Sequence, residues 1–426
     1  MGSGSTIKSI SARQIFSNRG HPGIECTVVT ENGACGTAEV TAGVSVGKYE
    51  VKFLYDGGER WRGRGVNAAV ASIMEKIAPK VIGMDAANQQ EIDQVIIALD
   101  GTEDKHNLGG NATAGVSAAV LKAGAAALGI PLYRHIGGAN ACTLPVPGAI
   151  SLVGSTRYGH GERSGGKPSH SLYCYGFDTY SDASYAAYTV QQTYADIIKA
   201  KFGLDQRFGA FVPPGHVKHD REIWDLHVEA IQKSGYEGKI GIQVDVAAGT
   251  YYNAEKDVYE GLFSAEDKTR DDLYKLYEQM CDNYPFVILE DPLDEDDYEG
   301  HAVLTKELGV QIVGDDLFTT NTRRVQHGIE TGAANCVLLK VNQIGTISEA
   351  FDMVRLAYRN GYGVMPCDSR GEGPSIADYV VGLNTGHLRE GGVGPVANRF
   401  LEIEAELGER AQFLGLSALK VSRSDR

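Results

Sequence analysis

Short apolar runs alternate with helical stretches along the second half of the chain. Each run ends on a polar residue, and the later runs follow one another at about 25 residues, which is room for one strand, one loop and one helix. Regular repetition of this unit predicts a (β/α)8-type barrel, a fold whose chemistry lies at the carboxyl ends of its strands. The runs are IGIQVDVA, FVILEDP, VQIVGDD, CVLLKVN and YGVMPCD, with polar ends at Asp245, Glu290, Asp315, Lys340 and Asp368.

The first part of the chain has strands before helices. Residues 7–56 alternate as β structure does, and the turn signal Glu31-Asn32-Gly33 predicts a hairpin. Residues 66–83 and 112–129 carry small and apolar residues at helical spacing and end at glycine. This order predicts an α+β capping domain ahead of the barrel. The predicted domains are residues 1–140 and 141–426, with two prolines near the boundary.

A segment rich in Gly, Ser, His and Tyr, residues 154–182, precedes the barrel repeats. Its composition is typical of a mobile lid or a substrate-contacting loop, and an ordinary surface loop stays open as the alternative. The stretch after it, residues 183–203, has helical spacing, whereas FVPPGH at 211–216 cannot be helical because of its paired prolines.

Composition narrows the class of protein. The chain of 426 residues is long enough for a large core with pockets. It carries 55 acidic against 40 basic residues, and the net charge of −15 argues against a nucleic-acid or anionic membrane surface. Seven cysteines without a zinc-like spacing indicate reduced thiols, and no apolar run is long enough to span a membrane. We expect a cytoplasmic enzyme.

Three strand ends carry carboxylates. Asp245, Glu290 and Asp315 would converge at the mouth of a barrel, and hard oxygen ligands suit Mg²⁺ better than zinc. Unrelated acids at strand ends are the alternative.

Lys340 ends the strand after Asp315. Beside a divalent cation its pKa can fall towards working pH, which makes it a candidate general base, unless it forms a salt bridge with one of the carboxylates. A metal ion and a base together suit proton removal next to a carboxylate, because the cation stabilises the enediolate.

Several motifs, in order along nearly the whole chain, resemble those of the enolase family. They are SNRGHPGIEC at 17–26, LDGTEDKHNLGGNATAGVS at 99–117, DVAA at 245–248, LEDP at 289–292, VGDDL at 313–317, LKVNQIGT at 339–346 and LEIEAELG at 401–408. The resemblance implies an N-terminal α+β cap on an enolase-type modified (β/α)8 barrel. It also implies a carbon–oxygen lyase that acts on a small anionic acid, and a homo-oligomer.

Carried over residue by residue, the resemblance assigns roles. Asp245, Glu290 and Asp315 would bind one Mg²⁺, and Lys340 would be the base. A second Mg²⁺ stays open. Ser45, in the loop TAGVSVGKYE, would be its ligand and would also contact the substrate. The other assigned residues are His160 and Arg389, as catalytic groups, and Asp368, Ser369 and Arg370, at the substrate.

Departures from the family pattern gather at the same site. The segments that carry two active-site glutamates in the family correspond to residues 207–214 and 169–176, and neither contains an acid. Asp368 stands where the family has a histidine, and Arg389 stands where it has a lysine. Cationic and hydrogen-bonding residues in the segment 154–182 could meet an additional carboxylate; they are Arg157, His160, Arg163, Lys167 and His170.

These departures favour a lyase whose substrate has shifted from 2-phosphoglycerate to another phosphorylated or phosphonylated acid. The enolase-like carboxyphosphonoenolpyruvate synthases of phosphinate antibiotic pathways are an example. Two alternatives stay open, an ordinary phosphopyruvate hydratase with unusual loops and a non-catalytic enolase-fold binding protein. Both enzyme interpretations predict exchange of the substrate's α-proton with solvent.

Overall fold

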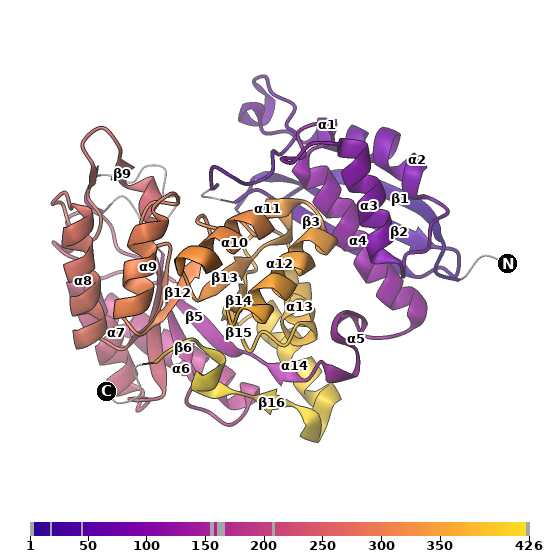
Figure 1. The fold of residues 1–426 in the computed structure, drawn as a ribbon. Helices are drawn as coiled ribbons and strands as arrows, with labels where there is room; N and C mark the ends of the chain where they lie inside the picture. The colour runs from indigo at the N-terminus through magenta and orange to yellow at the C-terminus, as the bar shows by residue number, and fades with distance from the viewer. Residues whose placement is uncertain are drawn as a thin grey trace.

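The computed structural model consists of a small α+β unit beside a barrel (Figure 1). The residues that it describes are 4–17, 19–43, 46–153, 157–159, 167–206 and 209–422.

The N-terminal unit begins with an antiparallel sheet of order β1-β2-β3, with bounds Ile7–Phe16, Pro22–Thr30 and Cys35–Thr41. Its second turn confirms the predicted hairpin, with Gly33 at a φ of +84°. The prediction of β structure up to residue 56 is wrong beyond Thr41. The chain leaves the sheet there and crosses to the barrel, where the Val51 amide donates to the Gln343 carbonyl at 3.0 Å.

Helices cover one face of this sheet. The longest, α4 (Gly110–Leu128), packs on β2 and β3, and a side chain at Gly36 would meet the Ala119 carbonyl at 2.2 Å. Both predicted helical stretches are confirmed, although the first is divided by a π-helical turn at Ile73–Ile77. The other helices of the unit are α1 (Asn67–Ser72), α2 (Ala78–Val81), α3 (Gln89–Asp100) and α5 (Leu132–Gly137).

A curled mixed sheet forms the barrel, in the order β15-β5-β6-β8-β11-β12-β13-β14. Its terminal strands β14 and β15 contact each other, and short β7 (Ala210–Phe211) adds to β5. The strand β6 runs antiparallel to both neighbours, so its beginning lies where other strands end. The bounds are β5 Val146–Val153, β6 Ser169–Cys174, β8 Ile240–Asp245, β11 Phe286–Glu290, β12 Gln311–Gly314, β13 Cys336–Leu339, β14 Gly363–Pro366 and β15 His387–Gly391.

Helices follow the barrel strands as the apolar repeats predict. The predicted helix at 183–203 is confirmed within α6, and FVPPGH forms no helix. Among the described residues no single helix is long and apolar enough to cross a membrane. One pair of helices, bent by 96°, meets these two criteria jointly, by length and composition alone. The helices are α6 (Tyr180–Phe202), α7 (Arg221–Lys233), α8 (Arg270–Asn283), α9 (Tyr298–Glu307), α10 (Thr322–Thr331), α11 (Val341–Ile344), α12 (Ile347–Arg359), α13 (Ile376–Gly382) and α14 (Pro395–Leu407).

Candidate active site

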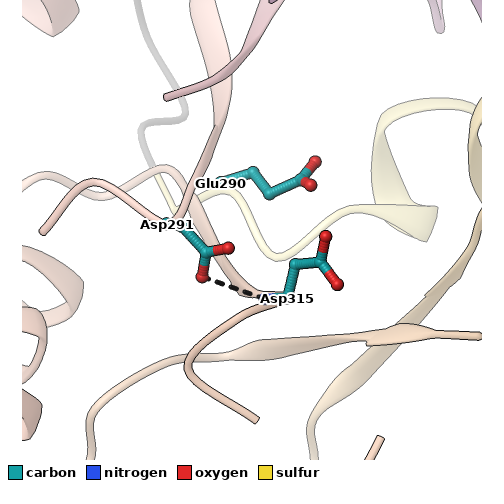
Figure 2. Close-up of side chains that lie close together, drawn as sticks. All are labelled: Glu290, Asp291 and Asp315. Atoms are coloured by element: carbon teal, nitrogen blue, oxygen red, sulfur yellow. Dashed lines mark hydrogen bonds between the residues drawn. The ribbon is translucent and has the colours of Figure 1, made fainter. Parts of the chain in front are cut away.

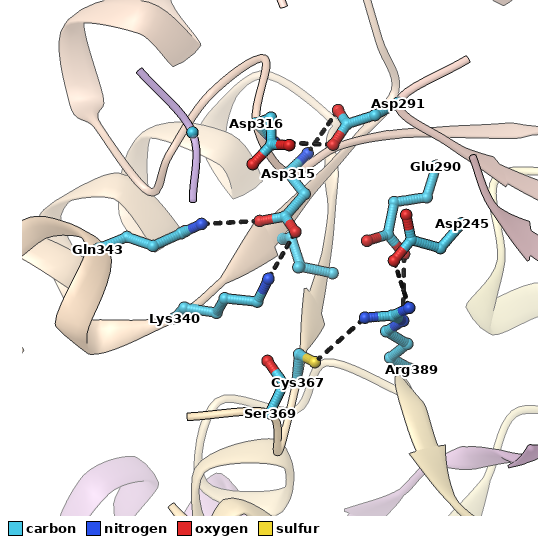
Figure 3. A network of polar contacts seen from close by, with 12 residues as sticks. Asp245, Glu290, Asp291, Asp315, Asp316, Lys340, Gln343, Cys367, Ser369 and Arg389 are labelled. Carbon is cyan, nitrogen blue, oxygen red and sulfur yellow. Dashed lines mark hydrogen bonds and ion pairs between the residues drawn. The ribbon is translucent and has the colours of Figure 1, made fainter. Parts of the chain in front are cut away.

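Charged side chains gather at one end of the barrel (Figure 3). Glu290 lies opposite Asp245 in the register of β11 and β8, and Asp315 and Lys340 directly follow β12 and β13. Arg389 reaches the same place from β15. All five side chains are buried, so any charge among them needs a partner.

Three carboxylates approach one another closely in this group. Glu290, Asp291 and Asp315 each offer an oxygen within 4.8 Å of the others, which is an arrangement that can hold a metal ion (Figure 2). The Oε1 atom of Glu290 is buried without a hydrogen-bond partner among the described residues. An orphaned anionic oxygen of this kind fits a hard cation such as Mg²⁺.

Asp291 is a member of this cluster that the sequence analysis did not single out, although it lies next to Glu290 in the motif LEDP. Its carboxylate accepts the backbone N–H groups of Asp315 and Asp316 at 3.0 and 2.8 Å. Its own φ is +43°, an uncommon conformation for a residue other than glycine. Asp291 therefore positions the loop that carries Asp315.

Asp245 lies beside Glu290 but outside the close group of three. Its Oδ2 atom is in contact with two cations, the Arg389 guanidinium and the Lys167 ammonium group. Of the three predicted ligands, the structure thus brings Glu290 and Asp315 into one cluster and pairs Asp245 with basic residues.

Lys340 is buried and its Nζ lies 2.5 Å from Oδ2 of Asp315. Burial is the largest influence on Lys340 and opposes its charge, but Asp315, Cys367 and Glu290 act against it, and the pKa of Lys340 is raised above its usual value. The expected fall in this pKa concerns Lys340 beside a bound divalent cation and stays a prediction, whereas the salt bridge considered as the alternative is present. Gln343 holds the other oxygen of Asp315 at 2.8 Å.

Arg370 connects the barrel to the N-terminal unit. Its two terminal nitrogens each donate to Glu50 at 2.6 Å, and both side chains are buried. The Arg370 carbonyl accepts the Thr41 amide at 2.9 Å. A side chain at Gly43 would lie 2.5 Å from the Arg370 guanidinium carbon, so this segment fits closely around it.

Asp368 and Ser369 precede Arg370 at the end of β14. Asp368 accepts the Gly373 amide at 3.0 Å, and burial together with Glu372 and Glu390 raises its pKa to about 7. The Ser369 hydroxyl is buried without a partner among the described residues, while its carbonyl accepts from Arg19 at 2.7 Å.

Basic and hydroxyl groups occupy the side of the mouth formed by β6 and β15. Arg389 donates to the Ser169 hydroxyl at 3.0 Å and lies 3.8 Å from the Cys367 sulfur. Burial, with help from Arg389, lowers the pKa of Lys167 to about 7. In the described part of the chain, neither β6 nor residues 209–214 contain an acid.

Two predicted site residues, Ser45 and His160, lie outside the described residues, as does Arg163. The prediction that Arg157 and His170 meet a substrate is wrong. Arg157 pairs with buried Asp220 at 2.8 Å, and His170 accepts from Trp224 of α7 at 3.1 Å, on the helical side of the sheet.

Glu50 and Gln343 were also missed by sequence reasoning. Gln343 stands three residues after Lys340, in the motif LKVNQIGT, and this spacing could have signalled it. No local signal identifies Glu50, because its partner Arg370 is 320 positions away.

The chain matches two family models, "Enolase, N-terminal domain" over residues 7–136 and "Enolase, C-terminal TIM barrel domain" over residues 169–422. Curated relatives named Enolase match almost end to end. The protein of Methanopyrus kandleri is 42% identical, covering 96% of this chain and 97% of its own. The proteins of Bifidobacterium animalis subsp. lactis and Methanocaldococcus jannaschii are 41% and 40% identical, covering 98% and 94% of this chain and 99% and 96% of their own.

These matches confirm the predicted fold class, an N-terminal α+β domain followed by a TIM-type barrel, and they confirm the family resemblance. They agree better with ordinary enolase activity than with the phosphonate substrate, because every relative named here is called Enolase.

Proposed function

The chain belongs to the enolase family and is a carbon–oxygen lyase of the enolase superfamily, and we propose that it converts 2-phosphoglycerate, or a closely similar phosphorylated acid, to an enolpyruvate product. The observation that carries this proposal is the direct link between Lys340 and the acid cluster. A base and a metal-binding group share Asp315, so both can act on one bound acid.

The family implies Mg²⁺, and we assign its ligands to Asp245, Glu290 and Asp315. Asp291 would support them through the backbone. The cation supplies charge stabilisation for the enediolate that forms when a carbon next to a carboxylate loses its proton. Whether Ser45 helps to hold a second Mg²⁺ stays a prediction.

Lys340 is the base in this proposal. Its Nζ needs only to turn from Asp315 to the substrate's C2 proton, because the ammonium group and the acid cluster are already in contact. Arg389 would hold the substrate's carboxylate. Arg370 and Ser369 would bind its phosphoryl group, since the Ser369 hydroxyl is buried without a described partner, and Asp368 lies beside them. His160 stays a predicted catalytic residue.

Solvent exchange tests the proposal. In deuterated buffer with Mg²⁺, we expect proton NMR to show loss of the C2 proton of 2-phosphoglycerate and formation of phosphoenolpyruvate. Lys340→Ala should abolish exchange by removing the base, while calorimetric Mg²⁺ binding persists. Lys256→Ala, at an exposed lysine outside the site, is the matched control. Exchange that survives in Lys340→Ala would exclude this lysine as the base.

A second candidate is an acid whose recognition differs from that of 2-phosphoglycerate, including a phosphonate-bearing one. The observation that favours it is the basic and hydroxyl character of one side of the mouth. Ser169 and Lys167 lie there, and neither β6 nor residues 209–214 contain an acid. Absence of product from 2-phosphoglycerate, combined with exchange of the α-proton, would favour this candidate. Absence of both would favour the non-catalytic binding protein instead.

A further inference from the structure

We propose that two buried glutamines, Gln243 and Gln343, are positioning residues that make the acid cluster selective for Mg²⁺ over Ca²⁺. Each donates an amide hydrogen to one oxygen of a carboxylate assigned to the metal, so that the carboxylate offers its other oxygen to the cation. The inference rests on the proposed function, because it takes Glu290 and Asp315 as metal ligands. It concerns the groups around these ligands, which orient them and tune their preference among ions.

Gln343 fixes the orientation of Asp315. Its Nε2 donates to Oδ1 of Asp315 at 2.8 Å, while Lys340 contacts Oδ2 (Figure 3). Its Oε1 accepts the Thr320 hydroxyl hydrogen at 2.8 Å, and the whole side chain is buried. Were the amide turned over, its oxygen would lie against the Asp315 carboxylate, which cannot donate when ionised. The donor side of Gln343 therefore faces the acid.

Gln243 has the same relation to Glu290. It lies two residues before Asp245 in β8, on the same face of the strand, and pairs in register with Ile288 of β11. Its Nε2 donates to Oε2 of Glu290 at 3.2 Å, and its side chain is buried. The other oxygen of Glu290, Oε1, is the one without a hydrogen-bond partner among the described residues. Gln243 thus engages one oxygen and leaves the second for a cation.

The neutral amides can keep their places when a cation binds, whereas the charged neighbours cannot. Lys340 contacts Asp315, and Nε of Arg389 lies 3.4 Å from Oε2 of Glu290. A divalent cation at these carboxylates repels both basic groups. An amide carries no net charge, so the cation gives it little reason to leave. Each carboxylate then keeps one oxygen on its glutamine and turns the other to the metal.

One available oxygen from each carboxylate suits Mg²⁺ better than Ca²⁺. Mg²⁺ demands near-ideal octahedral coordination and is usually bound through a few carboxylates and several waters. Ca²⁺ takes more oxygens in a flexible arrangement and often uses both oxygens of one carboxylate. A glutamine that occupies the second oxygen removes a ligand that Ca²⁺ would use and Mg²⁺ would not. The charge of the cluster attracts either ion, so the selectivity comes from the two hydrogen bonds.

Calorimetric titrations of the metal-free protein with Mg²⁺ and with Ca²⁺ test the inference. Methionine has nearly the length of glutamine but no donor. We expect Gln243→Met and Gln343→Met each to weaken Mg²⁺ binding about tenfold, as for one hydrogen bond to a charged group. Ca²⁺ binding should weaken by no more than about twofold, because the freed oxygen can join its ligands. Gln191→Met is the matched control, since this buried glutamine donates to the Ile150 carbonyl outside the acid cluster.

A purely structural role for the two glutamines would give another result. A loosened fold would weaken Mg²⁺ and Ca²⁺ binding by the same factor. A ratio of the two affinities that stays within about twofold of the wild-type ratio would overturn the role of the glutamine that was replaced. If a methionine variant fails to fold, the asparagine variant takes its place, because its shorter side chain keeps the amide but does not reach the carboxylate.

The inference and the proposed function fail separately. Exchange of the α-proton of 2-phosphoglycerate, together with an unchanged ratio in both variants, would overturn the selectivity role and leave the lyase proposal standing. A wild type that binds neither ion would overturn the assignment of Glu290 and Asp315 as ligands, and the inference with it. Absence of exchange by a wild type that binds Mg²⁺ would count against the lyase proposal alone.

Discussion

At the scale of single residues, Glu290 and Asp291 are neighbours with opposite tasks. Glu290 has an oxygen without a described partner, whereas the Asp291 oxygens accept backbone N–H groups. We expect Asp291→Asn to lower the free energy of unfolding by about 1–3 kcal/mol, because an amide cannot accept at both positions. Glu290→Gln should lower stability less, because Arg389 keeps Asp245 as its partner, but weaken Mg²⁺ binding at least about tenfold. Urea unfolding measures the stability of each variant, and calorimetry measures its Mg²⁺ affinity. If both variants change the two quantities equally, Glu290 and Asp291 do not have opposite tasks.

Asp368 gives a pH dependence whose sign follows from its pKa. In the folded state this pKa is raised to about 7 by burial, Glu372 and Glu390, whereas the unfolded chain has a value near 3.9. Between these values the folded state binds more protons, so this group lowers stability as the pH rises from about 4 to 7. We expect Asp368→Asn to reduce the loss of unfolding free energy between pH 5 and pH 8. Denaturant titrations at both pH values measure it, and an unchanged loss would contradict the raised pKa.

At this scale the sequence predicted which residues gather but not how they pair. Lys340, Asp315 and Glu290 lie together because strand ends meet at one end of a barrel, which the apolar repeats already indicate. The ion pairs of Asp245 depend on side-chain reach across strands, and no spacing along the chain reports that.

At the scale of elements, the segment after β3 is the main surprise. It continues the alternating pattern of the sheet but leaves it at Thr41, because Glu50 and Val51 find partners on the barrel. Alternation specifies a half-buried strand only where a neighbouring strand is available to pair with it. The same limit applies to β6, whose direction depends on its neighbours and cannot be read from its apolar residues.

Glu50 and Arg370 form the ion pair that joins this segment to β14. We expect Glu50→Gln to cost about 3–5 kcal/mol of unfolding free energy, because it leaves the buried Arg370 charge without an anionic partner. Hydrogen exchange should also speed up at the amides of residues 41–51. Glu103→Gln is the control, since its pair with Arg323 is exposed and should contribute little. Equal effects of the two substitutions would contradict the importance of burial.

At the scale of the whole molecule, the order of strand-rich and repeat-rich halves was enough to predict the fold class. Each half buries a core of its own, so the spacing of the hydrophobic residues within that half is enough to indicate its architecture. The boundary at residue 140, the cytoplasmic location and the homo-oligomer stay predictions. They depend on surfaces and partners, which the pattern of buried residues does not record.

The reversed direction of β6 has a consequence for protein engineering. In a uniformly parallel barrel, each strand is followed by its own mouth loop and then by a helix that returns along the outside. Here β5 and β6 are antiparallel neighbours, so the end of β5 and the beginning of β6 lie side by side at the mouth. Adjacent antiparallel strand ends can be joined without a crossover helix, so new substrate contacts placed between these two ends would not require a change in the outer layer of helices.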